Sequence, residues 1–184
     1  MKKLICLTLA ILVCASLAVP ALAANFVPSI TYKGRPSCNK IVVAIDGKEE
    51  TVEQGCLRIT PVSKANKLPE AEKELLQKVY KELSDGTMVL PYDKVEGINA
   101  DKMVIRELLD VAFVCDHEHA TKLKDEGVTV TLTFKLGVAK DDVLVAMTYV
   151  NDEWVPAVEL VNNGDGSVTC TFEDLCPVAF AIEG

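Results

Sequence analysis

A regular alternation of apolar and polar residues near the C-terminus limits the fold of this chain more than any other feature. Val128, Val130, Leu132 and Phe134 are separated by threonines, and the stretch 128–135 ends in lysine. A period of two is typical of a β-strand that has one face in the core and the other in water. The pattern recurs, with turn residues between the stretches, at 143–150, 154–161, 167–172 and 176–182. The sequence therefore predicts a β-meander within an antiparallel β-sandwich or an open barrel.

Strands are also predicted in the N-terminal half of the chain. The stretch 26–32 is assigned to an edge strand, because Pro28 has no N–H group to donate to a neighbouring strand. The pair 46–47, Asp-Gly, separates two strand-like runs at 41–45 and 50–53, and Asp-Gly in this place predicts a tight hairpin. Two further strands are predicted, at 56–62 and 87–90.

One main helix is predicted over about residues 68–84. Leu76, Val79, Tyr80 and Leu83 lie at i, i+3, i+4 and i+7, which gives the segment one apolar face. A proline precedes the segment and an Asp-Gly pair follows it, as expected at the two ends of a helix. The predicted fold class is therefore mostly β (α+β), with this helix packed on the sheet.

Residues 101–110 fit two structures. Val104, Leu108 and Val111 fit a helical stripe, whereas the apolar residues that follow are strand-like. We expect a short helix that runs into a strand.

The N-terminus predicts where the protein acts. Met1-Lys-Lys is followed by an uncharged run at 4–19 and by a small-x-small pattern that ends at Ala23. This arrangement is typical of a secretory signal peptide, here residues 1–23. The apolar run is shorter than the roughly 20 residues that a membrane-spanning helix needs. Residues 24–184 are therefore predicted to be one extracellular or cell-surface β-rich domain without a membrane span.

The charge of the chain argues against nucleic acid as a partner. The formal net charge is −8, and it becomes about −10 without the signal peptide, which holds two lysines and no acid. Binding to a phosphate backbone requires a concentrated basic surface, and no stretch of the sequence supplies one. The expected partner is an extracellular or cell-wall ligand, either a glycan or a protein.

Five cysteines remain after signal cleavage, an odd number for a secreted protein: Cys38, Cys56, Cys115, Cys170 and Cys176. A hairpin of the last two predicted strands would place Cys170 opposite Cys176, close enough for a disulfide. Cys38 and Cys56 bracket the Asp-Gly hairpin and form the second candidate pair. The alternative is that some or all of these cysteines are buried thiols.

Cys115, His117 and His119 form the densest group of metal-ligating atoms in the sequence. Alternate spacing on an extended segment would place all three on one side, and thiolate with imidazole suits Zn²⁺ or copper. A structural zinc site needs a fourth ligand, which the sequence does not identify. A solvated polar loop is therefore the preferred interpretation, and no cofactor is predicted beyond this candidate zinc site.

Trp154 is the only tryptophan, and it lies close to Tyr149 in the sequence. Buried, the indole would anchor the core of a hairpin. Exposed, it would stack with Tyr149 on a sugar ring, because an aromatic side chain offers a large apolar face with a polar edge.

Four stretches resemble a family of small secreted proteins and cell-surface modules of gut Firmicutes: Phe26–Lys33, Val104–Val111, Asn162–Gly166 and Phe172–Phe180. The C-terminal stretch is the most specific, because a hairpin with tryptophan followed by a final Pro-Val-Ala-Phe strand is similar to modules of larger cell-wall proteins. The resemblance implies a Gram-positive, anaerobic, extracellular setting. It supplies no catalytic residues, because the family has no established activity.

These observations leave three candidate functions. The first is a secreted, non-enzymatic surface or extracellular binding module, which the signal peptide and the β-rich pattern favour. The second is a metal-binding or redox protein that uses Cys115, His117 and His119, and metal analysis of the mature protein separates it from the first. The third is a hydrolase with a dispersed site, which a cleft lined by titratable groups with perturbed pKa would indicate.

Overall fold

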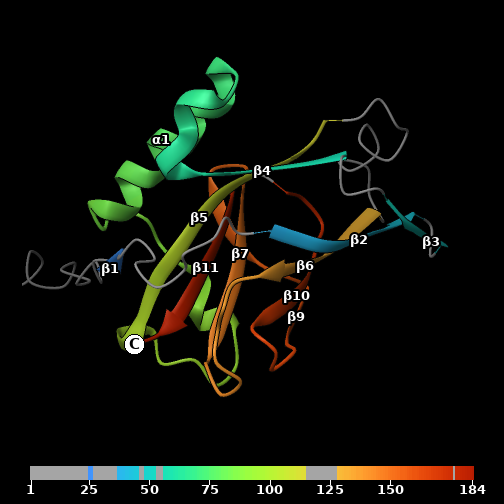
Figure 1. The fold of residues 1–184 in the computed structure, drawn as a ribbon. Coiled ribbons are helices and arrows are strands. Elements are labelled where there is room, and N and C mark those ends of the chain that lie inside the picture. Colours follow the sequence, from blue (N-terminus) through green and yellow to red (C-terminus); the bar gives the residue numbers. More distant parts are fainter. Residues whose placement is uncertain (1–24, 27–36, 46–47, 53–55, 115–127, 176) are drawn as a thin grey trace, which may run out of the picture.

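The computed structural model describes residues 25–26, 37–45, 48–52, 56–114, 128–175 and 177–184 (Figure 1). These residues form two packed β-sheets and a main helix, α1 (Glu70–Ser84), that covers the outer face of one sheet. The fold is therefore mostly β with a sandwich-like arrangement, α+β in class, as the sequence predicts.

The sheet next to α1 has six strands. In order across the sheet, five of them are β1 (Asn25–Phe26), β5 (Met103–Phe113), β11 (Val178–Glu183), β7 (Leu144–Val150) and β8 (Glu153–Pro156). The sixth strand, β4 (Leu57–Pro61), also pairs with β5. β1 runs parallel to β5, and the other pairs of this sheet are antiparallel.

The second sheet has five antiparallel strands. Their order is β3 (Lys48–Thr51), β2 (Ser37–Ile45), β6 (Val128–Lys135), β10 (Ser167–Phe172) and β9 (Glu159–Asn162). Short 3₁₀ turns complete the described elements: η2 (Val62–Lys67), η3 (Pro91–Lys94) and η4 (Ala100–Lys102).

Two apolar cores lie on the two faces of the six-stranded sheet. Between the sheets, the rings of Phe134 and Phe180 meet edge to face with centroids 5.1 Å apart. On the other face, Leu76, Val79 and Leu83 of α1 are fully buried against β5, β7 and β11. The six-stranded sheet is therefore covered on both sides, whereas the five-stranded sheet keeps one face in water.

Helix α1 matches the predicted segment. Its first turn carries Glu70 and Glu72, which suit the positive end of the helix dipole. At the other end Gly86 adopts a positive φ of 67°, and its N–H donates to the carbonyl of Leu83. Glycine adopts this conformation without steric cost, so the helix ends where the sequence predicts.

The predicted Asp-Gly hairpin and the following strand are also confirmed. β2 and β3 pair in antiparallel register up to Ile45 and Lys48, which leaves a two-residue connection. The strand predicted at 56–62 is β4. Of the predicted strand 26–32, only Phe26 lies within the described residues, in β1, and it pairs with β5.

The predicted β-meander is wrong, because the chain crosses to the other sheet after β6, after β8 and after β10. β6 belongs to the five-stranded sheet, β7 and β8 to the other, β9 and β10 to the first again, and β11 to the second. The alternation of apolar and polar residues shows which side chains face the core, but it does not show which strands pair with each other. The predicted strand 154–161 accordingly divides into β8 and β9. At the crossing, the Ala157 N–H donates to Ala146 of one sheet and the Val158 N–H donates to Thr171 of the other.

The strand predicted to follow residue 110 is confirmed as part of β5, but the helix predicted within 101–110 is wrong, because β5 already begins at Met103. The register with β11 shifts between Phe180 and Ala181, which leaves Arg106 as an extra residue in β5. Ile105 and Leu108 therefore both face α1 although they are three positions apart. A bulge in a strand that is buried on both faces thus imitates the spacing of a helix.

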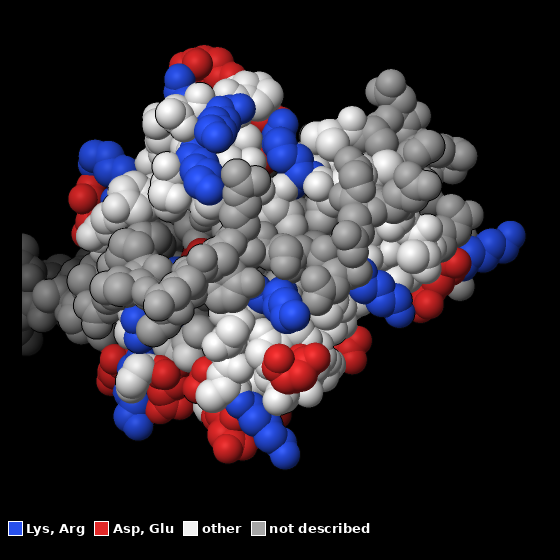
Figure 2. Space-filling view, viewed as in Figure 1, with Lys and Arg blue, Asp and Glu red and all other residues white. Residues whose placement is uncertain are grey.

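The strand predicted at 87–90 is absent, and these residues form an extended loop between α1 and η3. Among the described residues, no helix is long and apolar enough to cross a membrane. The face of the molecule in Figure 2 carries acidic and basic side chains side by side.

Candidate functional site

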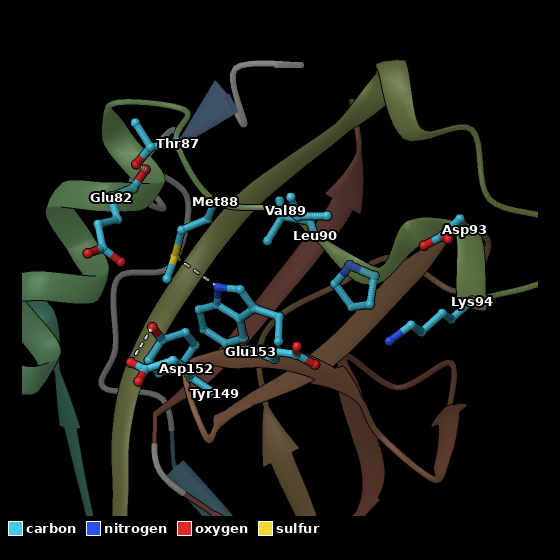
Figure 3. A pocket seen from close by; sticks show the side chains of 12 residues that line it. Glu82, Thr87, Met88, Val89, Leu90, Asp93, Lys94, Tyr149, Asp152 and Glu153 are labelled. Carbon is cyan, nitrogen blue, oxygen red and sulfur yellow. Dashed lines mark hydrogen bonds between the residues drawn. The ribbon is translucent and has the colours of Figure 1, made fainter. Parts of the chain in front are cut away.

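A hollow on the described part of the chain lies between α1, the loop that follows it and the β7–β8 hairpin (Figure 3). We call this hollow, of about 700 Å³, the Trp154 groove. It is lined by Glu82, Thr87, Met88, Val89, Leu90, Pro91, Asp93, Lys94, Tyr149, Asp152, Glu153 and Trp154.

A tight turn brings the two aromatic residues of the groove together. Asn151 and Asp152 connect β7 to β8 with φ angles of 51° and 64°, the positive values of a type I′ turn. Tyr149 and Trp154 are therefore directly opposite each other across the hairpin, with ring centroids 5.4 Å apart. The structure thus brings together the two residues that the sequence singled out for ligand stacking.

Trp154 is held firmly in the wall of the groove. Its side chain is only 3% exposed, and its Nε1–H donates to the sulfur of Met88 over 3.1 Å. Tyr149 is similarly buried, at 6% exposed. Stacking on a sugar requires an exposed ring face, so this burial favours the alternative in which Trp154 anchors the hairpin.

Asp152 links the hairpin turn to α1. Its Oδ1 accepts hydrogen bonds from Lys78 Nζ at 2.9 Å and from the Tyr149 hydroxyl at 3.2 Å. Lys78, followed by Tyr149, holds the pKa of the Asp152 carboxyl below its usual value. The hydrogen bond to Asp152 raises the pKa of Lys78, and burial raises the pKa of Tyr149. This turn is therefore held with its carboxylate ionised and its phenol neutral at pH 7.

The rim of the groove is acidic. Glu82 belongs to α1, Asp93 to η3 and Glu153 to β8, and within the described part of the chain none of their carboxylates forms a hydrogen bond or an ion pair. Figure 3 shows Glu82 on the α1 side and Asp93 with Lys94 on the η3 side. Lys94 is the one cationic side chain in the lining.

An apolar loop closes one side of the groove. Val89 is 89% exposed, whereas Met88 and Leu90 on either side of it pack against the core beneath α1. The sequence pattern predicts a strand at 87–90 and gives no sign of a site there. The signal against a strand is Pro91, which directly follows these residues, because proline interrupts strand pairing.

A second surface, the threonine face, lies on the exposed side of the five-stranded sheet. Threonine hydroxyls of β6 and β10 pair at 2.9 Å (Thr131 and Thr171) and at 3.0 Å (Thr133 and Thr169). A hollow of about 410 Å³ lies over part of this face. Because these hydroxyls are hydrogen-bonded to one another, they are less available to a ligand than the carboxylates at the rim of the groove.

The remaining site predictions stay untested. Cys115, His117 and His119 lie outside the described residues, as do Cys176 and the side chain of Cys38. Within the described residues no group of three or more His, Cys, Asp or Glu side chains could hold a metal ion. Both candidate disulfides therefore remain predictions.

The hairpin invoked for Cys170 and Cys176 is nevertheless absent. β10 pairs with β6 and β9, whereas β11 pairs with β5 and β7 of the other sheet. Cys170 is buried between the sheets, with Leu132 and Leu160 as its cross-strand neighbours, and Cys56 is buried in the same core.

No protein-family model, curated protein or solved structure matches this chain.

Proposed function

We propose that this protein is a secreted, non-enzymatic binding module whose ligand occupies the Trp154 groove. One observation carries the proposal: a hollow with an apolar wall and three free carboxylates at its rim, built on a rigid hairpin. The wall is formed by Met88, Leu90, Pro91 and the edge of Trp154.

The dimensions of the groove support this proposal. Ligand sites in proteins are hollows of about 300–1,000 Å³ with mostly apolar linings and a few placed polar groups. The groove, at about 700 Å³, lies within this range. Three contacts fix its walls before any ligand arrives: the bond from Trp154 to Met88 and the two bonds to Asp152. A preorganised site loses less conformational entropy on binding.

The electrostatics of the groove favour binding over proton transfer. A general acid or base works best when its pKa lies near the working pH. The pKa of Asp152 is instead lowered by Lys78 and Tyr149, so this carboxylate is a weak base. Its two hydrogen bonds also fix its orientation, which suits a structural role at the base of a binding site.

Secretion is the second part of the proposal, and the N-terminal sequence supports it. A basic start, an apolar run and a small-x-small pattern ending at Ala23 suit a signal peptide. The resemblance to surface modules of gut Firmicutes gives the same setting, with a cell-wall or extracellular ligand. The N-terminal residue of the exported protein, measured by mass spectrometry, tests this part, and a mature chain that retains residues 1–23 would contradict it.

Binding can be tested through Trp154, because its fluorescence is the only tryptophan signal of the chain. Residues 24–184 would be titrated with soluble peptidoglycan fragments, neutral oligosaccharides and short peptides of each charge. We expect one of these ligand classes to change the fluorescence emission of Trp154. Val89→Ser, which removes an apolar contact at the rim of the groove without adding charge, should weaken that binding by about tenfold, equivalent to 1.4 kcal/mol.

A matched control is available in Val158→Ser. Val158 is also an exposed valine, but it lies between β8 and β9, away from the groove lining. Equal effects of the two variants on affinity, or no emission change with any class, would contradict the proposed site.

A further inference from the structure

We infer that the Trp154 groove takes the side chain of a lysine presented by a basic peptide segment. This inference rests on the proposed function, and it names the class of ligand for the same site. It follows from the charge at the rim, the shape of the apolar wall and the edge of β8 that pairs with no described strand.

The free charge of the groove is negative. Asp152 is matched by Lys78 at 2.9 Å, so it adds little net field. Glu82, Asp93 and Glu153 remain, against Lys94 alone. These carboxylates come from three separate elements around one hollow. A cation that enters the groove is therefore attracted from several sides, and an anion is repelled.

The form of the site favours lysine over arginine. Arginine binds best to a carboxylate fork or to an exposed aromatic face. The ring of Trp154 is 3% exposed, so it offers an edge and no face. An ammonium group is a point charge with three donors, which suits separate carboxylates. The four methylenes of lysine would then pack along Met88, Leu90 and Pro91, as long basic side chains do on apolar surface.

The surroundings favour a peptide over a free amine. Val89 stands 89% exposed beside the groove and offers apolar contact outside it. Among the described strands β8 pairs only with β7, so the other edge of β8 presents backbone donors and acceptors. Glu153 and Trp154 both belong to this strand. An extended segment alongside β8 could therefore form backbone hydrogen bonds while its lysine enters the groove.

The test compares three peptides that are uncharged apart from one central residue: lysine, Nε-acetyl-lysine or arginine. Acetylation keeps the methylene chain and removes the charge, so it isolates the ammonium group. We expect the lysine peptide to change Trp154 emission and to bind about tenfold more tightly than the acetylated peptide. Its affinity should fall as salt is raised from low to physiological ionic strength, because added ions screen exposed charges.

The protein side is tested with two doubly substituted chains of equal net charge. Glu82→Gln/Glu153→Gln removes two rim carboxylates and should weaken the lysine peptide by about tenfold. Glu159→Gln/Glu173→Gln removes two exposed acids outside the groove and should leave the affinity within about twofold. Circular dichroism of both variants establishes that each is folded.

The outcomes separate this inference from the proposed function. Equal binding of the lysine and acetylated peptides, or tighter binding of the arginine peptide, would overturn the lysine assignment and leave the groove as a site. Binding of a neutral oligosaccharide that Val89→Ser weakens, without binding of the lysine peptide, would do the same. If no peptide or oligosaccharide changes Trp154 emission, the inference and the proposed function both fail.

Discussion

At the scale of single residues, a buried carboxylate joins three elements. Asp110 of β5 is fully buried, and its Oδ2 accepts hydrogen bonds from Arg58 Nη2 at 3.1 Å and from Nε at 3.3 Å. Arg58 of β4 also donates to Glu72 of α1 at 2.6 Å. Burial alone would lower the pKa of Arg58, but Asp110 and Glu72 outweigh it and raise the pKa. This cluster fixes α1 against the sheet.

Arg58→Met should therefore lower the free energy of unfolding by about 3 kcal/mol, because it leaves a buried carboxylate without its guanidinium. Arg58→Met/Asp110→Leu should recover most of that loss, because a buried ion pair can be replaced by apolar side chains of similar volume. Urea unfolding of the single and double variants measures both effects. A double variant less stable than Arg58→Met would show that the Asp110 carboxylate stabilises the fold by contacts other than that with Arg58.

Tyr92 shows the opposite situation, a buried polar atom for which the described residues supply no hydrogen-bond partner. Its hydroxyl oxygen forms no hydrogen bond within the described structure, and burial raises the pKa of Tyr92 to about 12. Tyr92→Phe should therefore raise the free energy of unfolding at pH 7 by about 1 kcal/mol, since an unsatisfied buried group is removed.

The same substitution predicts a change in pH dependence. The unfolded phenol ionises at a pKa of about 10, so wild-type stability is fully present below that pH and is lost as pH rises towards 12. Tyr92→Phe should reduce this loss between pH 10 and 12, measured by thermal unfolding. Tyr80→Phe, which changes an exposed tyrosine of α1, is the control. An equal alkaline loss in wild type and Tyr92→Phe would contradict the assignment.

At the scale of elements, the sequence predicts best those segments whose two sides differ. α1 and β6 each have one buried side and one exposed side, so their periods of 3.6 and 2 are visible in the sequence. β5 is covered on both faces and contains a bulge, so neither period survives. For the same reason, the sequence predicts only part of the groove. Tyr149 and Trp154 lie in a recognisable hairpin, whereas the loop 87–90 has no repeating pattern.

At the scale of the whole molecule, stability depends on strands that are distant in sequence. The six-stranded sheet contributes side chains to both cores, and its central strands β5, β7 and β11 are all C-terminal to α1. β2 likewise pairs with β6, far along the chain. The alternation near the C-terminus predicted strands and a core, but sheet membership depends on these distant pairings, which no local pattern encodes.

Residues 24–184 are therefore expected to fold as one unit. A fragment that ends near residue 100 would lack β5, the partner of β4, and β6, the partner of β2. It would retain one hairpin, β2–β3, and a helix whose apolar face has no sheet to cover. An isolated two-stranded hairpin is marginally stable at best. Limited proteolysis should thus give no protected fragment that ends near residue 100. Two protected halves, each resistant to further digestion, would instead show that the two sides of that point fold independently.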